Sequence, residues 1–380
     1  MKKIWIGITI VVLVALAILL FITQTKKEPQ EIKIGAILPL TGDAALYGES
    51  IKKGIDLGVM QINEAGGIQG KKISILYEDS RALPADGVSA IRKLIDIHKV
   101  PVIIGDAVSS VTLAIAPIAE KNKVVLFSPL SSAPAITNAG DFIFRNVPSD
   151  LFQGKVAAYF SVKDQAWHSL AILYINNDYG VGLRDTFSNV VEALGGKIVA
   201  SEAYEQGSAD FRTQLSKIKE ANPQAVFVVG YREAAQILIQ AKEIGLKAKI
   251  LGTGLFEDPG IIKVTKDAAE EVFYTIPQYT SDSPEPKVRE FVKAFKEKHG
   301  SEPDIIAAYG YESMNVLHYA LAKSKLTSDS IKEELYKIKD FEGVTGKISF
   351  DENGDIIQPM GVKIIKEGKP IWYKKEVSLE

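Results

Sequence analysis

The chain has 380 residues, with 45 Lys and Arg against 47 Asp and Glu, and a net charge of −2. Its length suggests about two domains, or three, and the balanced charge gives no electrostatic support for a nucleic-acid-binding function. Because the chain contains no cysteine, disulfides, Cys-ligated zinc, iron–sulfur clusters and thiol catalysis are excluded.

The chain begins with a hydrophobic segment that is long enough to cross a membrane. Lys2 and Lys3 precede an uncharged run at residues 4–22. Only Gly7 and Thr9 interrupt the apolar character of this run. As a helix, these 19 residues would nearly match the roughly 30 Å hydrocarbon layer of a bilayer. We therefore predict an N-terminal transmembrane helix that is retained as an anchor.

A cleaved signal peptide is the alternative for this segment. Ala15-Leu16-Ala17 has the small-x-small spacing of a cleavage site, but the apolar residues 18–21 follow it. Residues 23–30 are a short polar tether, so residues 1–31 form a signal or anchor with its tether. In both cases the remaining chain is predicted to lie outside the cytoplasm.

The first half of the body alternates short β-rich runs with segments of helical periodicity. The predicted strands are at 32–38, 72–77, 100–104 and 124–127, and the predicted helices are at 47–64, 86–97 and 109–121. Strands separated by helices of this length indicate βαβ units and a parallel sheet.

The same alternation then starts again. Strands are predicted at 170–175, 197–202, 225–229 and 249–251, with helices at 180–194, 211–220, 233–243, 287–299 and 305–322 and a β-rich tail at 346–350, 361–365 and 371–373. The continuous apolar run at 225–229 is typical of a strand covered on both faces. Two successive α/β sets predict two lobes, each with its own sheet.

Motifs for catalysis or metal binding are missing or incomplete. There is no His-Glu-x-x-His, no Gly-x-Ser-x-Gly elbow and no P-loop. Asp351, Asn353 and Asp355 begin like a calcium loop, but Ile356 and Val362 occupy the positions that require glycine and glutamate. We therefore predict a protein that is not an enzyme and that has no cofactor and no metal site.

Three loops at the carboxyl ends of predicted strands, where open α/β sheets bind ligands, are candidates for ligand contact. They cover residues 105–110, 128–134 and 176–180. Ser109 and Ser110 begin a helix, so helix capping is the alternative to ligand binding for each of them. Tyr179 combines an apolar ring with a polar tip, and its alternative is a tyrosine packed on the surface.

Several segments resemble one known family. The sequence at 34–42, Tyr47-Gly48 and the Asn-Glu-Ala-Gly-Gly-Ile-Gln-Gly-Lys segment at 63–71 are similar to the start of periplasmic branched-chain amino-acid binding proteins, the type I solute-binding proteins of ABC importers. The similarity continues through Ser128-Pro129, Tyr179-Gly180 and Gly230-Tyr231, and it covers essentially residue 32 to the C-terminus.

The resemblance implies an α/β fold of two doubly wound parallel-sheet lobes joined by a three-stranded hinge, here preceded by the N-terminal transmembrane helix. Lobe 1 would comprise residues 32–148 plus 278–354. Lobe 2 would comprise residues 149–277 plus 355–380.

The resemblance also implies the ligand contacts of the first lobe. Ser109 matches the serine that binds the α-carboxylate and ammonium end of the ligand. Leu130 and Ser132 match the loop pair whose carbonyl and hydroxyl hold the same groups, and Tyr47 matches an aromatic residue beside the pocket.

In the second lobe, Tyr179 and Tyr231 match aromatic residues that close over the ligand side chain. The carboxylate that usually faces the ligand ammonium is absent from its matching position, which is Gly254. Glu257 and Asp258 are the nearest acids, and we predict Glu257 as the ammonium partner because its side chain is longer. Alternatively, the two acids belong structurally to the helix that follows, or the ligand has no ammonium group.

The function that these features predict is an extracytoplasmic solute-binding protein, tethered to the cytoplasmic membrane, that delivers a small aliphatic amino acid to the permease subunits of an ABC importer. Two alternatives remain open. One is a sensory ectodomain of the same fold, and the other is a solute-binding protein for a different small carboxylate or an amide.

Overall fold

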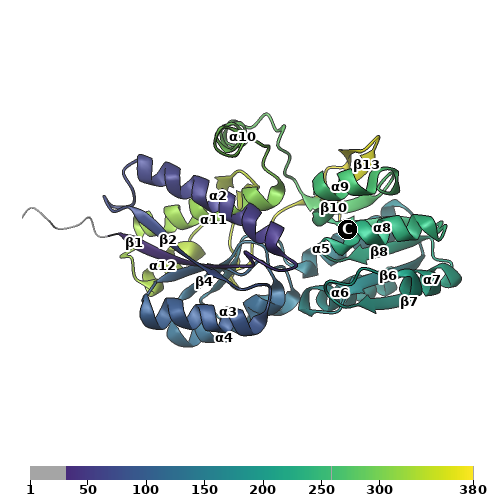
Figure 1. Cartoon of the computed structure of the whole chain (residues 1–380), viewed down its shortest axis with the longest axis horizontal. Helices are drawn as coiled ribbons and strands as arrows, with labels where there is room; N and C mark the ends of the chain where they lie inside the picture. The colour runs from purple at the N-terminus through teal and green to yellow at the C-terminus, as the bar shows by residue number, and fades with distance from the viewer. Residues whose placement is uncertain (1–30, 258, 380) are drawn as a thin grey trace, which may run out of the picture.

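The computed structural model describes residues 31–257 and 259–379 and places them in two α/β lobes side by side (Figure 1). The first lobe has a five-stranded sheet in the order β2-β1-β3-β4-β5, and every neighbouring pair is parallel. Its strands are β1 (Ile32–Leu38), β2 (Ile73–Asp79), β3 (Val102–Gly105), β4 (Val125–Ser128) and β5 (Ile143–Arg145).

Helices cover both faces of this sheet. In Figure 1, α3 and α4 lie on one side, and α2 and α11 lie on the other. The helices of this lobe are α2 (Ala45–Glu64), α3 (Pro84–Arg92), α4 (Ser109–Asn122), α10 (Pro286–His299), α11 (Ile305–Lys323) and α12 (Ser328–Tyr336).

Close packing of α2 on α11 brings the starts of both helices to the same edge of the lobe. A Cβ atom at Gly54 would lie 2.0 Å from the carbonyl oxygen of Ala307, and one at Gly310 would lie 2.2 Å from that of Ile51. No real Cβ fits at such distances, so glycine is required at both positions for this approach.

The second lobe has a seven-stranded sheet in the order β14-β13-β10-β9-β8-β6-β7. Its strands are β6 (Ser169–Ile175), β7 (Lys197–Tyr204), β8 (Ala225–Val229), β9 (Lys249–Thr253), β10 (Phe273–Pro277), β13 (Met360–Lys366) and β14 (Lys369–Lys374). Its helices are α5 (Asp150–Tyr159), α6 (Asp178–Ala193), α7 (Arg212–Ala221), α8 (Glu233–Glu243) and α9 (Pro259–Thr265).

This second sheet differs from the purely parallel sheet predicted from the sequence. β13 pairs antiparallel with both β10 and β14. The β13–β14 pairing follows from the two-residue turn between them, in which Glu367 and Gly368 both have positive φ angles, 51° and 69°. Such a turn makes a tight hairpin, and a hairpin joins strands only in the antiparallel sense.

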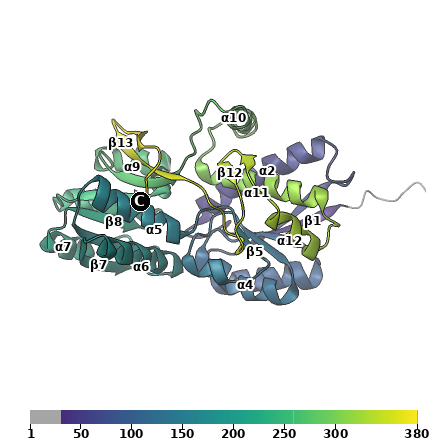
Figure 2. The same cartoon turned by 180° about the vertical axis from the view of Figure 1, so that it is seen from behind.

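The chain passes between the lobes three times: after β5, after β10, and between β12 and β13. The strands β11 (Phe341–Gly343) and β12 (Gly346–Ile348) form a separate two-stranded sheet before the last passage. The first and third crossings run side by side, because Pro148 forms a parallel bridge with Ile356. Figure 2 shows from behind the yellow third crossing running between the lobes.

The predicted transmembrane helix at residues 4–22 and its tether lie outside the described residues. Across residues 31–257 and 259–379, no helix combines the length and apolar character that a membrane span requires. The described chain begins at the end of the first lobe that is far from the second lobe (Figure 1).

Candidate functional site

A cavity of about 80 Å³ lies between the lobes, where the loops after β3 and β4 face the loops after β6, β8 and β9. At about 10–15 Å³ for each enclosed water-sized group, this is room for roughly five to eight such groups. Six of the seven residues predicted to contact a ligand line it: Tyr47, Ser109, Leu130, Ser132, Tyr179 and Tyr231. The structure therefore brings together residues that are up to about half the chain apart in sequence.

Ser109 is the first residue of α4 and is only 2% exposed. Its hydroxyl accepts a hydrogen bond from the Ala133 N–H at 3.2 Å, and the capping position of α4 is Val108, which makes no side-chain cap. Ser109 therefore does not cap its helix as the alternative prediction had it. The start of α4 also presents backbone N–H groups without intrahelical acceptors, which favour an anion.

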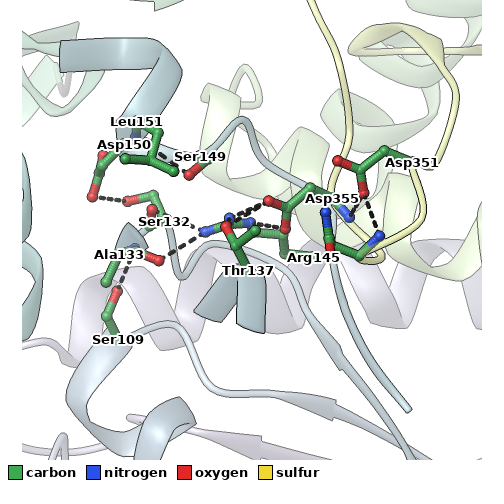
Figure 3. A network of polar contacts seen from close by, with 11 residues as sticks. Ser109, Ser132, Ala133, Thr137, Arg145, Ser149, Asp150, Leu151, Asp351 and Asp355 are labelled. Atoms are coloured by element: carbon green, nitrogen blue, oxygen red, sulfur yellow. Dashed lines mark hydrogen bonds and ion pairs between the residues drawn. The ribbon is translucent and has the colours of Figure 1, made fainter. Parts of the chain in front are cut away.

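Ser132 is held in place from two sides. Its hydroxyl donates to Asp150 Oδ2 at 3.0 Å, and its carbonyl oxygen accepts from the Asp150 N–H at 2.8 Å and from Arg145 Nη1 at 3.0 Å. Figure 3 shows Ser132 between these two partners, with Ser109 close to Ala133 in the same loop region. The loop that lines the cavity is thus tied to the first crossing between the lobes.

Asp150 is a candidate site residue that the sequence analysis missed. It is completely buried, and burial raises its pKa to about 7, against the opposing effects of the Ser132 hydrogen bond and the Arg145 charge. Its Oδ1 atom has no hydrogen-bond partner among the described residues. Its charge acts on Tyr179 and Tyr231, both of which line the cavity. The available sequence signal was Ser149-Asp150, a good start for a helix that was not predicted.

Three tyrosines form an aromatic wall that joins the lobes. The rings of Tyr179 and Tyr231 are stacked, with centroids 5.5 Å apart, and the ring of Tyr47 meets Tyr231 edge-on at 5.9 Å. Tyr47 comes from α2 in the first lobe, and the other two come from the second lobe. Burial raises the pKa of both Tyr179 and Tyr231, so their hydroxyls stay protonated at neutral pH. Tyr179 is 6% exposed, which excludes the alternative of a surface tyrosine.

Glu257 departs from the prediction made for it. Gly254 lines the cavity, but Glu257 lines a neighbouring one and forms an ion pair with Lys363 Nζ at 2.5 Å. The physical reason is the burial of Lys363, whose side chain is only 4% exposed, since a buried ammonium needs an anion beside it. Asp258 lies outside the described residues.

The cavity lining combines a few polar groups with mainly apolar side chains. Ser109 and the start of α4 supply hydrogen-bond donors. The Ser132 hydroxyl, which donates to Asp150, supplies an acceptor, and Asp150 behind it adds a potential negative charge. The remaining lining is mainly aliphatic and includes Leu130, Leu255, Ile276, Ile305, Ile306 and Met360. This arrangement suits a small molecule with a charged head and a short apolar tail.

The sequence profile of the periplasmic binding protein family matches residues 31–369. A leucine-, isoleucine-, valine-, threonine- and alanine-binding protein from Pseudomonas aeruginosa is 31% identical over 327 residues, which cover 86% of this chain and 87% of that protein.

Solved structures show the same similarity. A leucine-binding protein from Thermotoga maritima superposes with a TM-score of 0.83 at 33% identity, covering 90% of this chain and 97% of that one. The substrate-binding protein of a branched-chain amino acid transporter from Streptococcus pneumoniae, in complex with isoleucine, has a TM-score of 0.83 at 31% identity and covers 90% of this chain and 98% of that one.

The buried Asp150 carboxyl predicts a specific pH dependence of stability. Its pKa in the folded protein, about 7, lies above the value of about 3.9 expected when unfolded. Between these values the folded state holds the proton more tightly, so this group destabilises the protein as the pH rises. The asparagine in Asp150→Asn cannot ionise. We therefore expect the Tm of this variant minus the wild-type Tm to increase from pH 4 to 7 and to stay constant at higher pH. Thermal melts across this range measure the difference.

The control for this experiment is Asp185→Asn, which alters a carboxylate whose side chain is 55% exposed. Its Tm difference from the wild type should change little with pH. A Tm difference for Asp150→Asn that stays constant from pH 4 to 8 would show that Asp150 does not titrate in this range.

Proposed function

Because the chain belongs to the periplasmic binding protein family, we propose that it is an extracytoplasmic solute-binding protein that encloses one small aliphatic amino acid between its lobes. The family resemblance predicted from the sequence is confirmed by the match over residues 31–369. The observation that carries the proposal is the small interlobe cavity, in which a few polar groups lie among mainly apolar walls. Its size suits a ligand of the size of valine or leucine.

The first lobe is proposed to bind the carboxylate of the ligand. The start of α4 offers backbone N–H groups and the positive end of the helix dipole, which favour an anion. The hydroxyl of Ser109 accepts the Ala133 N–H, so its own proton is available to a ligand oxygen. Ser132 lies on the neighbouring loop and faces the same cavity.

Asp150 is proposed as the partner of the ligand ammonium, in place of Glu257. Its buried Oδ1 lacks a partner among the described residues, and a buried carboxylate in this state gains from a nearby cation. A ligand ammonium would favour the ionised carboxylate and so lower the pKa of Asp150 from its raised value near 7. Glu257 is already neutralised by Lys363.

Capture is proposed to proceed by closure of the lobes about the three crossings. The ligand first contacts lobe 1, residues 32–148 plus 278–354, and lobe 2, residues 149–277 plus 355–380, then closes over it and excludes water. The ring of Tyr231 contacts that of Tyr47 across the lobes, so the aromatic wall would cover a ligand in the cavity. The similarity to transporter proteins supports delivery to an ABC permease, with no chemical conversion of the ligand.

Binding of branched-chain amino acids, measured by titration calorimetry on residues 31–380, is the first test. Ser109→Ala and Ser132→Ala should each weaken binding by about 1–3 kcal/mol, because each removes a hydrogen bond to a charged group. The exposed control Ser201→Ala, which lies outside the cavity lining, should bind like the wild type. Wild-type affinity in both cavity variants would mean that the ligand binds elsewhere.

The role of Asp150 is tested by pairing a variant with a ligand analogue. Asp150→Asn should lose about 2–5 kcal/mol of binding to leucine, because one partner of a buried charge pair is removed. It should lose nothing for 4-methylpentanoate, which lacks the amino group. Glu257→Gln serves as the comparison and should bind leucine normally. Stronger wild-type binding to the deaminated analogue than to leucine would favour the alternative of a different small carboxylate.

An uncleaved anchor at residues 4–22 is proposed to keep the protein at the outer face of the cytoplasmic membrane. Its 19 uncharged residues suit a membrane span, and the polar residues 23–30 would serve as a tether to the folded body. The native protein should then sediment with membranes and need detergent for release. A native N-terminus found after Ala17 by mass spectrometry would instead establish a cleaved signal peptide.

A further inference from the structure

Arg145, the last residue of β5, is completely buried, and all five of its side-chain N–H groups have acceptors. Nε and one Nη2 hydrogen bind the two carboxylate oxygens of Asp355, each at 2.5 Å. The other Nη2 hydrogen binds Thr137 Oγ1 at 2.5 Å. Nη1 donates to the carbonyl oxygens of Ser132 at 3.0 Å and Ala133 at 2.9 Å.

The acceptors belong to two segments that are far apart in the sequence. Ser132 and Ala133 lie in the loop after β4, which lines the cavity and contacts Ser109. Asp355 lies at the start of the third crossing between the lobes, and its own N–H donates to Asp351 Oδ1 at 2.9 Å. Figure 3 shows Arg145 between the loop and this crossing.

The chemistry of the guanidinium makes this link rigid. Arginine keeps its charge in proteins, and its donors form a planar fork of fixed geometry. The bidentate pair with Asp355 fixes the plane of the fork and therefore the direction in which Nη1 points. Nη1 then holds the two consecutive carbonyl oxygens of Ser132 and Ala133. The backbone at Ser132 therefore cannot rotate without breaking a hydrogen bond to a charged group.

We propose that Arg145, anchored on Asp355, is a positioning residue for ligand capture that holds the Ser132–Ala133 loop in its binding geometry and connects it to the third crossing. The ligand part of this inference rests on the proposed function. Arg145 itself touches no ligand, because its donors are all occupied by the protein. The competing account is a buried ion pair that stabilises the first lobe as a whole.

Hydrogen–deuterium exchange of the ligand-free protein separates these accounts without a ligand. The Ser131 and Ala133 amides are bonded to the hydroxyls of Ser128 and Ser109, so the wild-type loop should exchange slowly. In Asp355→Asn, peptides covering residues 130–136 should exchange about tenfold faster, the factor that corresponds to the loss of one hydrogen bond to a charged group. Peptides from β1 and β3 should be unchanged.

Thr137→Val is the milder second variant, because it removes only the hydroxyl that bridges Arg145 and Asp355. It decides the question if Asp355→Asn fails to fold, and it should also speed exchange in the loop. The control is Asp141→Asn, which removes an exposed ion pair with Lys332 in the same lobe. Unchanged loop exchange in Thr137→Val, or faster exchange throughout the lobe, would overturn the proposal.

A double-mutant cycle for leucine binding then tests the effect on capture. Thr137→Val and Ser132→Ala should each weaken binding, and the double variant should bind no more weakly than Ser132→Ala, because both act through one loop. Independent, additive losses would contradict the positioning role. A wild-type protein that binds no amino acid would refute the proposed function, whereas the exchange experiment would still decide the role of Arg145.

Discussion

Parallel strands end at one edge of their sheet, and the candidate site depends on this constraint in both lobes. The loops after β3 and β4 leave the first sheet toward the second lobe, and the loops after β6, β8 and β9 return toward the first. Neither lobe encloses the cavity alone. A ligand in this cavity would contact loops of both lobes, and a change in the angle between the lobes would change the cavity.

Two buried charged groups beside the cavity loops differ in how completely their polar atoms are paired. Asp150 is buried with one oxygen unpartnered, and Arg145 is buried with a full set of acceptors. Burial of the Asp150 carboxyl outweighs the opposing effect of the Arg145 charge, which fits a group that gains a further partner when a ligand binds. Arg145 is the opposite case, because its saturation by Asp355, Thr137 and two carbonyls leaves it nothing to offer a ligand. Asp150 is therefore suited to binding a ligand, and Arg145 is suited to holding the loop that lines the cavity.

Local periodicity accounts for the elements that the sequence predicted well. The strand at 225–229 and the helix at 233–243 coincide with β8 and α8, because a short β-rich apolar run and a helix with one apolar face are both clear local patterns. The elements that the sequence analysis missed have weaker signals. β5 has only three residues, and α5 is buried on several sides through Val156, Ala157 and Ala158, so it shows no single apolar stripe. The antiparallel addition of β13 and β14 depended on a tight turn at Glu367-Gly368.

The sequence by itself determined the two α/β lobes, the family and six residues that line the cavity, because local patterns and motifs carry that information. Tertiary structure alone decided which acid lies beside the loop that lines the cavity. Glu257 pairs with Lys363, which is 106 residues away in the sequence. Asp150 accepts a hydrogen bond from Ser132, whose carbonyl oxygen is bound by Arg145. Arg145 in turn pairs with Asp355, 210 residues away. The charge of a side chain can be read from its residue type, but its availability depends on which opposite charge the fold places beside it.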